Sequence, residues 1–248
     1  MKINPYLIEI AGAIIKGIKF IPYMVKLFVQ YLRFSNKNGK RFSKRITDIY
    51  PLLYDNTSKT LFDPHYIYHP AWAARIIAET KPALHTDISS TLAFCTMISA
   101  FVPVKFFDYR PADILLNNLS SKQADLLKLA FEDNSIESLS CMHVVEHIGL
   151  GRYGDKLDYD GDLKAIAELK RVLAKGGNLL FVVPVSDRPR IMFNAHRIYS
   201  YGQIISYFKE LRLMKFSVVL DNTKFIENAV ESDIENQSYA CGCFWFRK

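Results

Sequence analysis

Residues 125–184 carry the pattern from which the architecture follows, and they read DLLKLAFEDNSIESLSCMHVVEHIGLGRYGDKLDYDGDLKAIAELKRVLAKGGNLLFVVP. Residues 163–173 repeat apolar side chains at offsets of three and four, which predicts an amphipathic helix lying on a sheet. Gly176 and Gly177 follow, and glycine takes the left-handed conformation at a helix end without a side-chain clash. Residues 178–185 are almost wholly apolar, which predicts a strand covered on both faces.

This order of strand, helix, glycine turn and strand predicts a βαβ unit, and such units build parallel sheets. In open parallel sheets, ligands bind in the crevice beyond the carboxyl ends of the strands. Residues 143–147 and the residues that follow Pro184 are therefore expected at the mouth of a cleft.

Three short motifs in this region resemble, in order and spacing, those of class I methyltransferases that use S-adenosylmethionine. They are Phe131-Glu132-Asp133-Asn134-Ser135, Val144-Val145-Glu146-His147 and Glu168-Leu169-Lys170-Arg171-Val172-Leu173-Ala174-Lys175-Gly176-Gly177. More narrowly, the chain resembles an uncharacterised methyltransferase-like family associated with bacterial surface-polysaccharide genes. The resemblance implies a Rossmann-like α/β fold, with a mostly parallel seven-stranded sheet and helices on both faces.

The same resemblance implies that S-adenosylmethionine is the cofactor and that the turn after the first strand binds it. Residues 83–88 are the expected first strand, and Asp87 lies at its end. Relatives follow such an acidic residue with a glycine-rich turn, because the backbone must approach the cofactor closely. Here Ser89 and Ser90 occupy the turn, with Ser89 where a glycine is expected. Small serines permit the turn, and their hydroxyls are candidate ligands.

Five further residues are expected around the cofactor from the resemblance. Asp108, at the end of the second expected strand, stands where relatives bind both ribose hydroxyls with one carboxylate. Asp125 and Leu126 would contact the adenine, and Met142 and His143 would line the same pocket. Two alternatives stay open. Asp108 could be a turn residue that only ends a strand, and Met142 could only pack in the core.

The candidate catalytic residues lie beyond the fourth and fifth expected strands. His147 and His196 are candidate bases, because imidazole is poised to take a hydroxyl proton at neutral pH. Asp155 belongs to a glycine-rich, acidic loop and is a candidate orienting group or ion ligand. One alternative is that His196 is a structural loop histidine whose hydrogen bonds are made within the protein. Another is that acidic residues of the Asp155 loop cap the next helix. The cations expected to hold an anionic substrate are Arg188, Arg190 and Arg197.

The amino-acid composition indicates the charge of a binding partner but does not identify the partner. The formal net charge of +7 and the pI of about 9.1 favour an anionic partner. The basic residues concentrate near the N-terminus, and no basic-aromatic module stands out, so nucleic acid is not favoured. The four cysteines lack the CxxC spacing of zinc sites, so we expect buried thiols and no bound metal. Nothing indicates disulfides, which favours the reducing cytoplasm.

Residues 1–34 predict an amphipathic helix with one basic stripe on an otherwise apolar surface. Such a helix could bind the anionic inner face of a membrane. Packing on the protein's own domain or in a homodimer is an alternative of equal weight. Pro22 is expected to kink or divide it. Residues 35–64 are expected as a basic connector, and residues 65–248 as the methyltransferase-like domain.

The resemblance therefore implies a methyltransferase that acts at the membrane face on the sugar of a glycan or glycolipid intermediate. The alternative is a catalytically inactive relative that keeps the sheet, has lost the cofactor turn, and serves as a binding or scaffold protein. Ser89 and the absence of a Gly-x-Gly turn are the residues that support this alternative.

Overall fold

The computed structural model describes residues 5–36 and 41–248, in two units that comprise residues 1–62 and 63–248. Residues 1–4 of the predicted amphipathic segment and residues 37–40 of the predicted connector lie outside the described residues. The first unit contains helix α1 (Pro5–Ser35), which continues through Pro22 without dividing, and the short 3-10 helix η1 (Ile46–Asp48). The Tyr31 hydroxyl donates to the Lys44 carbonyl at 2.7 Å, so the connector packs back along the helix.

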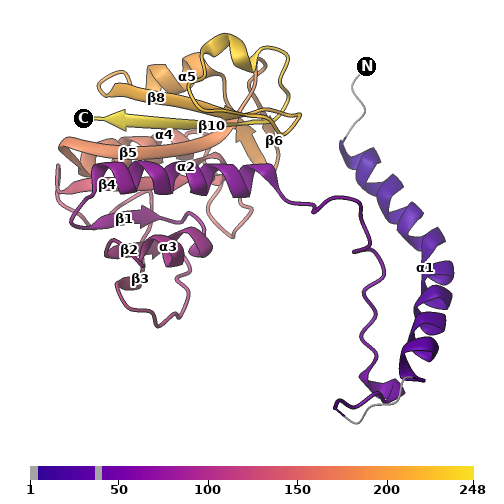
Figure 1. Ribbon diagram of the computed structural model, residues 1–248. Helices are drawn as coiled ribbons and strands as arrows, with labels where there is room; N and C mark the ends of the chain where they lie inside the picture. Colours follow the sequence, from indigo (N-terminus) through magenta and orange to yellow (C-terminus); the bar gives the residue numbers. More distant parts are fainter. Residues whose placement is uncertain (1–4, 37–40) are drawn as a thin grey trace. The chain divides into compact units, whose positions relative to one another are not determined.

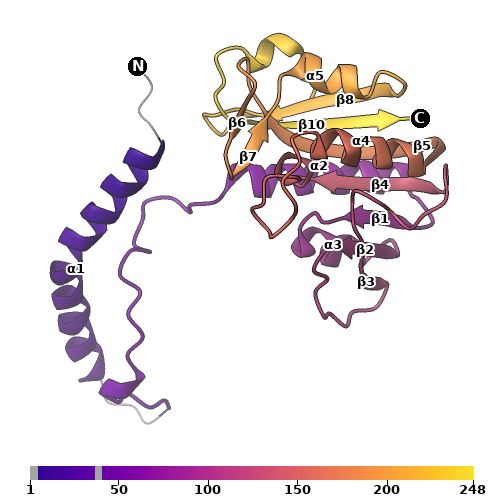
Figure 2. The same ribbon diagram turned by 180° about the vertical axis from the view of Figure 1, so that it is seen from behind.

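The second unit is built on one sheet whose strands follow the order β3-β2-β1-β4-β5-β10-β8-β9 (Figures 1 and 2). The first five of these are parallel, and β10, β8 and β9 continue the sheet in antiparallel pairs. The strands are β1 (His85–Ile88), β2 (Val104–Asp108), β3 (Leu119–Gln123), β4 (Ile136–Met142), β5 (Leu173–Val185), β8 (Arg212–Val219), β9 (Phe225–Ile226) and β10 (Ala240–Arg247).

The sheet has eight strands, so the predicted number of seven is wrong. The additional strand is β9, a two-residue edge strand that pairs Phe225 with Val219 and Ile226 with Val218. It lies in a loop that carries no strand-length apolar run, which is why the sequence gives no sign of it. A separate hairpin is formed by β6 (Arg190–Met192) and β7 (His196–Ile198).

Helices cover both faces of the sheet, as predicted. Helix α2 (Pro64–Thr80) runs across one face (Figure 1), where it packs with α3 (Leu92–Ile98) in one apolar cluster. Helices α4 (Gly161–Val172) and α5 (Tyr201–Tyr207) lie on the opposite face (Figure 2). Alternate residues of each central strand face the two clusters, because side chains in a strand point to opposite sides. On β10, Cys241 and Cys243 therefore face α2. Two 3-10 helices, η2 (Val145–His147) and η3 (Glu231–Ile234), complete the domain.

Gly176 and Gly177 do not end a helix, which corrects the sequence prediction. Helix α4 ends at Val172, and β5 begins directly at Leu173, so both glycines lie inside the strand. Gly176 has a φ of +77°, and the pairing of β4 with β5 shifts register beside it. A side chain at Gly177 would lie 3.0 Å from the Ile136 carbonyl oxygen. The glycine pair therefore allows an irregularity in the strand and a close approach of β4.

Arg171 at the end of α4 connects two of the quoted motifs. Its guanidinium donates to the carbonyls of Leu129 and Phe131, each at 2.8 Å, and to the carboxylates of Asp133 and Glu168. Glu168 in turn accepts from the Leu129 amide at 2.8 Å. The planar guanidinium presents five donors in a fixed geometry, which suits a site with several acceptors. One side chain thus fixes the 129–133 segment that leads into β4.

We predict that Arg171→Lys lowers the free energy of unfolding by about 1–3 kcal/mol, because an ammonium cannot reach this set of acceptors. The measurement is urea unfolding followed by circular dichroism. Arg212→Lys is the matched control, since Arg212 is an exposed arginine on β8. Equal losses in the two variants would contradict the role given to Arg171.

Candidate active site

A pocket of about 630 Å³ opens at the carboxyl ends of β1 and β4, the edge at which the sequence predicts a cleft. Its size lies within the range of small-molecule sites. It is lined by the turn after β1, the end of β4, η2, the following loop, the β6–β7 hairpin and the start of α2. The lining residues are Tyr66, Ser89, Ser90, Thr91, Met142, His143, Glu146, His147, Arg152, Tyr153, Asn194, Ala195, His196 and Tyr239.

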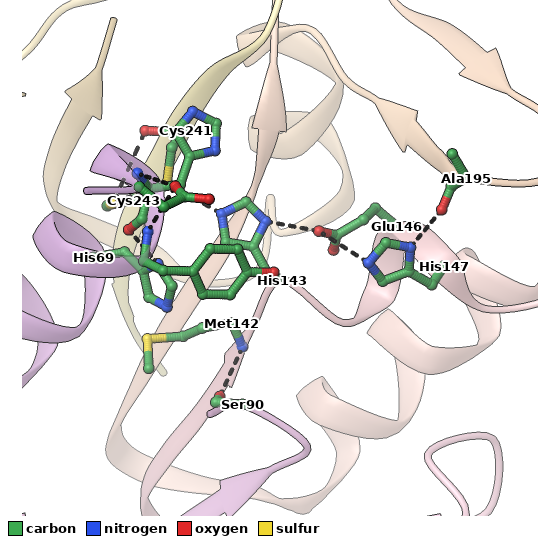
Figure 3. Close-up of polar contacts among 12 residues, drawn as sticks. His69, Ser90, Met142, His143, Glu146, His147, Ala195, Cys241 and Cys243 are labelled. Carbon is green, nitrogen blue, oxygen red and sulfur yellow. Dashed lines mark hydrogen bonds and ion pairs between the residues drawn. The ribbon is translucent and has the colours of Figure 1, made fainter. Parts of the chain in front are cut away.

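The carboxylate of Glu146, a residue of the pocket lining, lies between the imidazoles of His143 and His147 (Figure 3). Glu146 Oε1 is 2.8 Å from His143 Nδ1 and 3.8 Å from His147 Nε2. The glutamate side chain is only 1% exposed, and its second oxygen has no hydrogen-bond partner among the described residues. Because a carboxylate only accepts, His143 Nδ1 is the donor, and His143 Nε2 is left with a lone pair.

His147 is held in the tautomer that a general base requires. Its Nδ1 lies 2.7 Å from the Ala195 carbonyl, which can only accept, and 3.3 Å from Arg152 Nη1, which itself donates to that carbonyl at 3.1 Å. The shorter contact places the proton on Nδ1 and leaves Nε2 free to take one. Burial lowers the pKa of His147 below its usual value, and the nearby Glu146 carboxylate partly offsets this effect. The imidazole is therefore neutral at pH 7.

Three of the six histidines, His143, His147 and His196, line the pocket, and the rings of His65 and His69 contact that of His143. The rings of His65 and His69 lie 5.5 and 5.1 Å from that of His143, and the ring of His196 lies 6.3 Å from that of His147. Burial lowers the pKa of His65 to about 4 and lowers that of His196. His196 Nε2 is buried and has no partner within the described part of the chain. Burial thus favours the neutral form of His65 and His196.

The turn after β1 has, at a serine, a backbone conformation that glycine usually supplies. Ser89 has a φ of +56°, the left-handed conformation that favours glycine. Its hydroxyl donates to the Phe107 carbonyl, while the Ser90 hydroxyl accepts from the Met142 amide at 3.1 Å. The carboxylate of Asp87 accepts from the Ser90 amide and the Ser140 hydroxyl. Serine thus keeps the turn without glycine.

Asp87 stabilises this turn by a hydrogen bond from within the core, and it does not line the pocket. It is fully buried, and burial raises its pKa to about 6 despite its hydrogen bonds. Ser89, Ser90, Met142 and His143, which the sequence also assigns to the cofactor, all line the pocket. The structure therefore brings four of the residues expected to bind the cofactor together around one pocket.

Three of the residues expected to contact the nucleoside, Asp108, Asp125 and Leu126, lie outside the pocket lining. Asp108 is half-buried at the end of β2 and accepts from the Arg110 amide at 2.7 Å through one oxygen. Asp125 is exposed and accepts from the Leu127 amide, and Leu126 is buried in the core. The binding roles of these three residues remain predictions from the resemblance.

Asp155 organises the loop after η2 and lies outside the pocket lining. It accepts from the amides of Gly149 at 2.7 Å and Tyr153 at 3.2 Å. Burial opposes its ionisation, but the backbone amides outweigh burial and lower the pKa of Asp155. Its contacts are with its own loop, and its predicted role beside a catalytic histidine remains a prediction.

The three arginines predicted to hold substrate do not line the pocket either. Arg197 is buried, donates to the carbonyls of Ile148 and Tyr159, and pairs with Asp162 at 3.5 Å. Arg190 donates to the Ser238 carbonyl, and Arg188 is exposed. Arg197 thus ties β7 to the loop that precedes α4, and the substrate roles stay untested predictions.

Several lining residues were not predicted. Glu146 belongs to a quoted motif, and its position three residues after His143 was a usable signal, because both follow directly on a strand. Arg152 and Tyr153 lie in the glycine-rich loop, and both Arg110 and Arg152 stack 5.1 Å from the Tyr153 ring. Tyr66 and Tyr239 are distant in sequence and meet here only through the fold.

The sheet order, with helices on both faces, makes this a Rossmann-like α/β fold. A family model described as a Caenorhabditis protein of unknown function, DUF268, matches residues 107–221, from the end of β2 to the residues just after β8. A comparison with curated proteins finds no match. Solved structures with similar folds are numerous, and methyltransferases that use S-adenosylmethionine are prominent among them.

Three solved structures illustrate the likeness. An N1-methyltransferase of 1,6-didemethyltoxoflavin from Burkholderia thailandensis, with S-adenosylhomocysteine bound, has 11% identity and a TM-score of 0.53 over 77% of this chain and 93% of its own. The N-methyltransferase NodS from Bradyrhizobium japonicum, in complex with S-adenosylhomocysteine, has 15% identity and a TM-score of 0.51 over 75% and 88%. The [4+2]-cyclase SpnF has 12% identity and a TM-score of 0.51 over 72% and 81%. At these identities the likeness concerns the fold.

Proposed function

We propose that the protein is a methyltransferase that uses S-adenosylmethionine and acts on a hydroxyl group. The observation that carries the proposal is His147, a neutral imidazole in the pocket whose Nδ1 proton is held by the Ala195 carbonyl. Methyl transfer to a hydroxyl needs alignment of the acceptor and removal of its proton. An imidazole with a free Nε2 is suited to that removal.

The pocket fits the cofactor in two respects. The left-handed turn at Ser89 lets the backbone approach a ligand, and Ser90, Met142 and His143 line the adjoining wall. On this proposal, Asp108 and Asp125 hold the nucleoside, as the resemblance implies. When bound, S-adenosylmethionine supplies an electrophilic methyl group.

Glu146 supports the proposed base. As His147 Nε2 takes the acceptor proton, the imidazolium that forms lies 3.8 Å from the buried carboxylate of Glu146. A buried carboxylate stabilises an adjacent imidazolium, because the charges attract strongly where water is excluded. Ala195 keeps the ring in place through Nδ1 throughout the step.

We propose a sugar hydroxyl of a surface-glycan or glycolipid intermediate as the acceptor. The resemblance to a polysaccharide-associated family supports this choice, and the pocket wall adds three tyrosine rings, those of Tyr66, Tyr153 and Tyr239. Aromatic rings with polar edges offer flat apolar surfaces and hydrogen bonds to one ligand.

One observation favours a second candidate, a non-catalytic binding or scaffold protein. The pocket lining includes Ser89 but none of Asp108, Asp125 and Leu126. A relative that had lost the nucleoside end of its cofactor site would keep the sheet and this pocket. Cofactor binding therefore separates the two candidates.

We predict that the full chain binds S-adenosylhomocysteine in isothermal titration calorimetry and that Asp108→Ala weakens binding about 10- to 100-fold, as loss of charged hydrogen bonds implies. Asp113→Ala is the matched control, because Asp113 is an exposed carboxylate in the loop after β2. Absence of heat with the wild-type chain would overturn the methyltransferase proposal and favour the scaffold.

We further propose that helix α1 binds an anionic membrane surface from the cytoplasmic side. Its apolar side chains are exposed in the first unit, with Ile18 at 73% and Ile21 at 72%. Lys19 and Lys26 are available to meet lipid headgroups. Among the described residues, no helix is long and apolar enough to cross a membrane.

We predict that the protein sediments with vesicles rich in anionic lipid and that added salt weakens this binding, since the cations contribute through screened attraction. The double substitution Lys19→Glu and Lys26→Glu should release the protein, whereas Lys209→Glu, at an exposed position beyond α5, should not. Equal sedimentation of both variants would contradict the anchor.

A further inference from the structure

Three potential metal ligands converge beside the pocket from three separate elements. They are His65 in the first turn of α2, His143 after β4 and Cys241 near the start of β10. One ligand atom from each lies within 4.8 Å of the other two, and His143 Nε2 is 3.3 Å from Cys241 Sγ. Zinc holds nitrogen at about 2.0–2.1 Å and sulfur at about 2.3 Å, so a shared ion requires spacings of this order.

The orientation of His143 is fixed as a zinc ligand requires. Its Nδ1 donates to Glu146, so its Nε2 lone pair faces Cys241 (Figure 3). Metal-bound histidines almost always donate their second ring nitrogen to a carboxylate or a backbone carbonyl. The ring of His65 is held by stacking on Tyr239, at 5.0 Å between ring centroids, and on His143, at 5.5 Å.

The chemical types of these three ligand atoms indicate which metal the site would bind. Two neutral imidazoles and one thiolate suit zinc, whereas magnesium and calcium prefer oxygen ligands. Three protein ligands leave the fourth tetrahedral position to water or a substrate, the arrangement of catalytic zinc sites.

We propose that His65, His143 and Cys241 bind a single zinc ion at the wall of the pocket. Binding displaces the thiol proton of Cys241 to solvent and replaces the Cys241–His143 contact with two bonds to the metal. His143 also lines the pocket, so the ion and a bound substrate share one wall. The zinc proposal does not rest on the proposed methyl transfer, although His143 belongs to both sites.

The sequence did not indicate this site, because its ligands lack a local spacing. Cys241 and His143 are 98 residues apart, and Cys241-Gly242-Cys243 differs from the CxxC pattern. Cys243 lies 3.9 Å from Cys241 Sγ but is outside the ligand group.

The test is titration of the metal-free full chain with Co²⁺, which reports ligands through its absorption. We expect saturation at one ion per chain, the visible bands of tetrahedral cobalt and a thiolate-to-cobalt charge-transfer band, all abolished by added zinc. Cys241→Ala should remove the charge-transfer band and weaken binding by at least about 10-fold. Cys141→Ala is the matched control, since Cys141 is also a fully buried thiol.

His65→Asn tests the site without altering a buried strand, because His65 is half-buried at the start of α2. It should keep the fold, checked by circular dichroism, and weaken Co²⁺ binding by a similar factor. Absence of cobalt bands in the wild-type chain, or bands unchanged in both Cys241→Ala and His65→Asn, would overturn the proposal. Neither outcome depends on whether the protein binds S-adenosylhomocysteine.

Discussion

The buried carboxylate of Glu146 is the constraint on which the site depends. A carboxylate with 1% exposure is costly unless polar groups satisfy it, and here His143 Nδ1 supplies the hydrogen bond at 2.8 Å. That bond fixes the tautomer of His143 and directs its Nε2 toward Cys241. The same oxygen lies 3.8 Å from His147 Nε2. One acidic side chain thus sets the orientation of one histidine and the electrostatic surroundings of the other.

This arrangement is possible because of where β4 ends. His143 has a φ of +56°, and its amide donates to the Val182 carbonyl on β5, so the chain turns immediately after the last buried residue of the strand. The 3-10 helix η2 follows within two residues and carries Glu146 and His147. The position of β4 is secured in turn from its other end, where Arg171 holds the preceding segment.

Sequence patterns predicted those parts of the fold that local periodicity determines. Helix α4 lies close to where apolar spacing places it, and Asp108 ends a strand, β2, as expected. Strand β9 escaped prediction because two residues carry no period, and the role of Gly176 and Gly177 depended on the neighbouring strand rather than on the helix before them.

The candidate site was predictable only where its residues follow strands. Ser89, Ser90, Met142, His143 and His147 were found this way, and all line the pocket. His65, Tyr66, Tyr239 and Cys241 come from the start of α2 and the region of β10, and only the folded sheet brings them together with His143. The tautomer of His147 depends on Ala195, a backbone carbonyl of the hairpin, which no side-chain pattern reveals.

The most direct test of this account is the pKa of His147, measured by NMR titration of the imidazoles in chelator-treated protein. Burial should place the pKa of His147 below 6.5, and Glu146→Gln should lower it further, because the carboxylate favours the protonated ring. Glu79→Gln, at an exposed position on α2, should leave it unchanged. A pKa for His147 that does not respond to Glu146→Gln would contradict the central role given to this carboxylate.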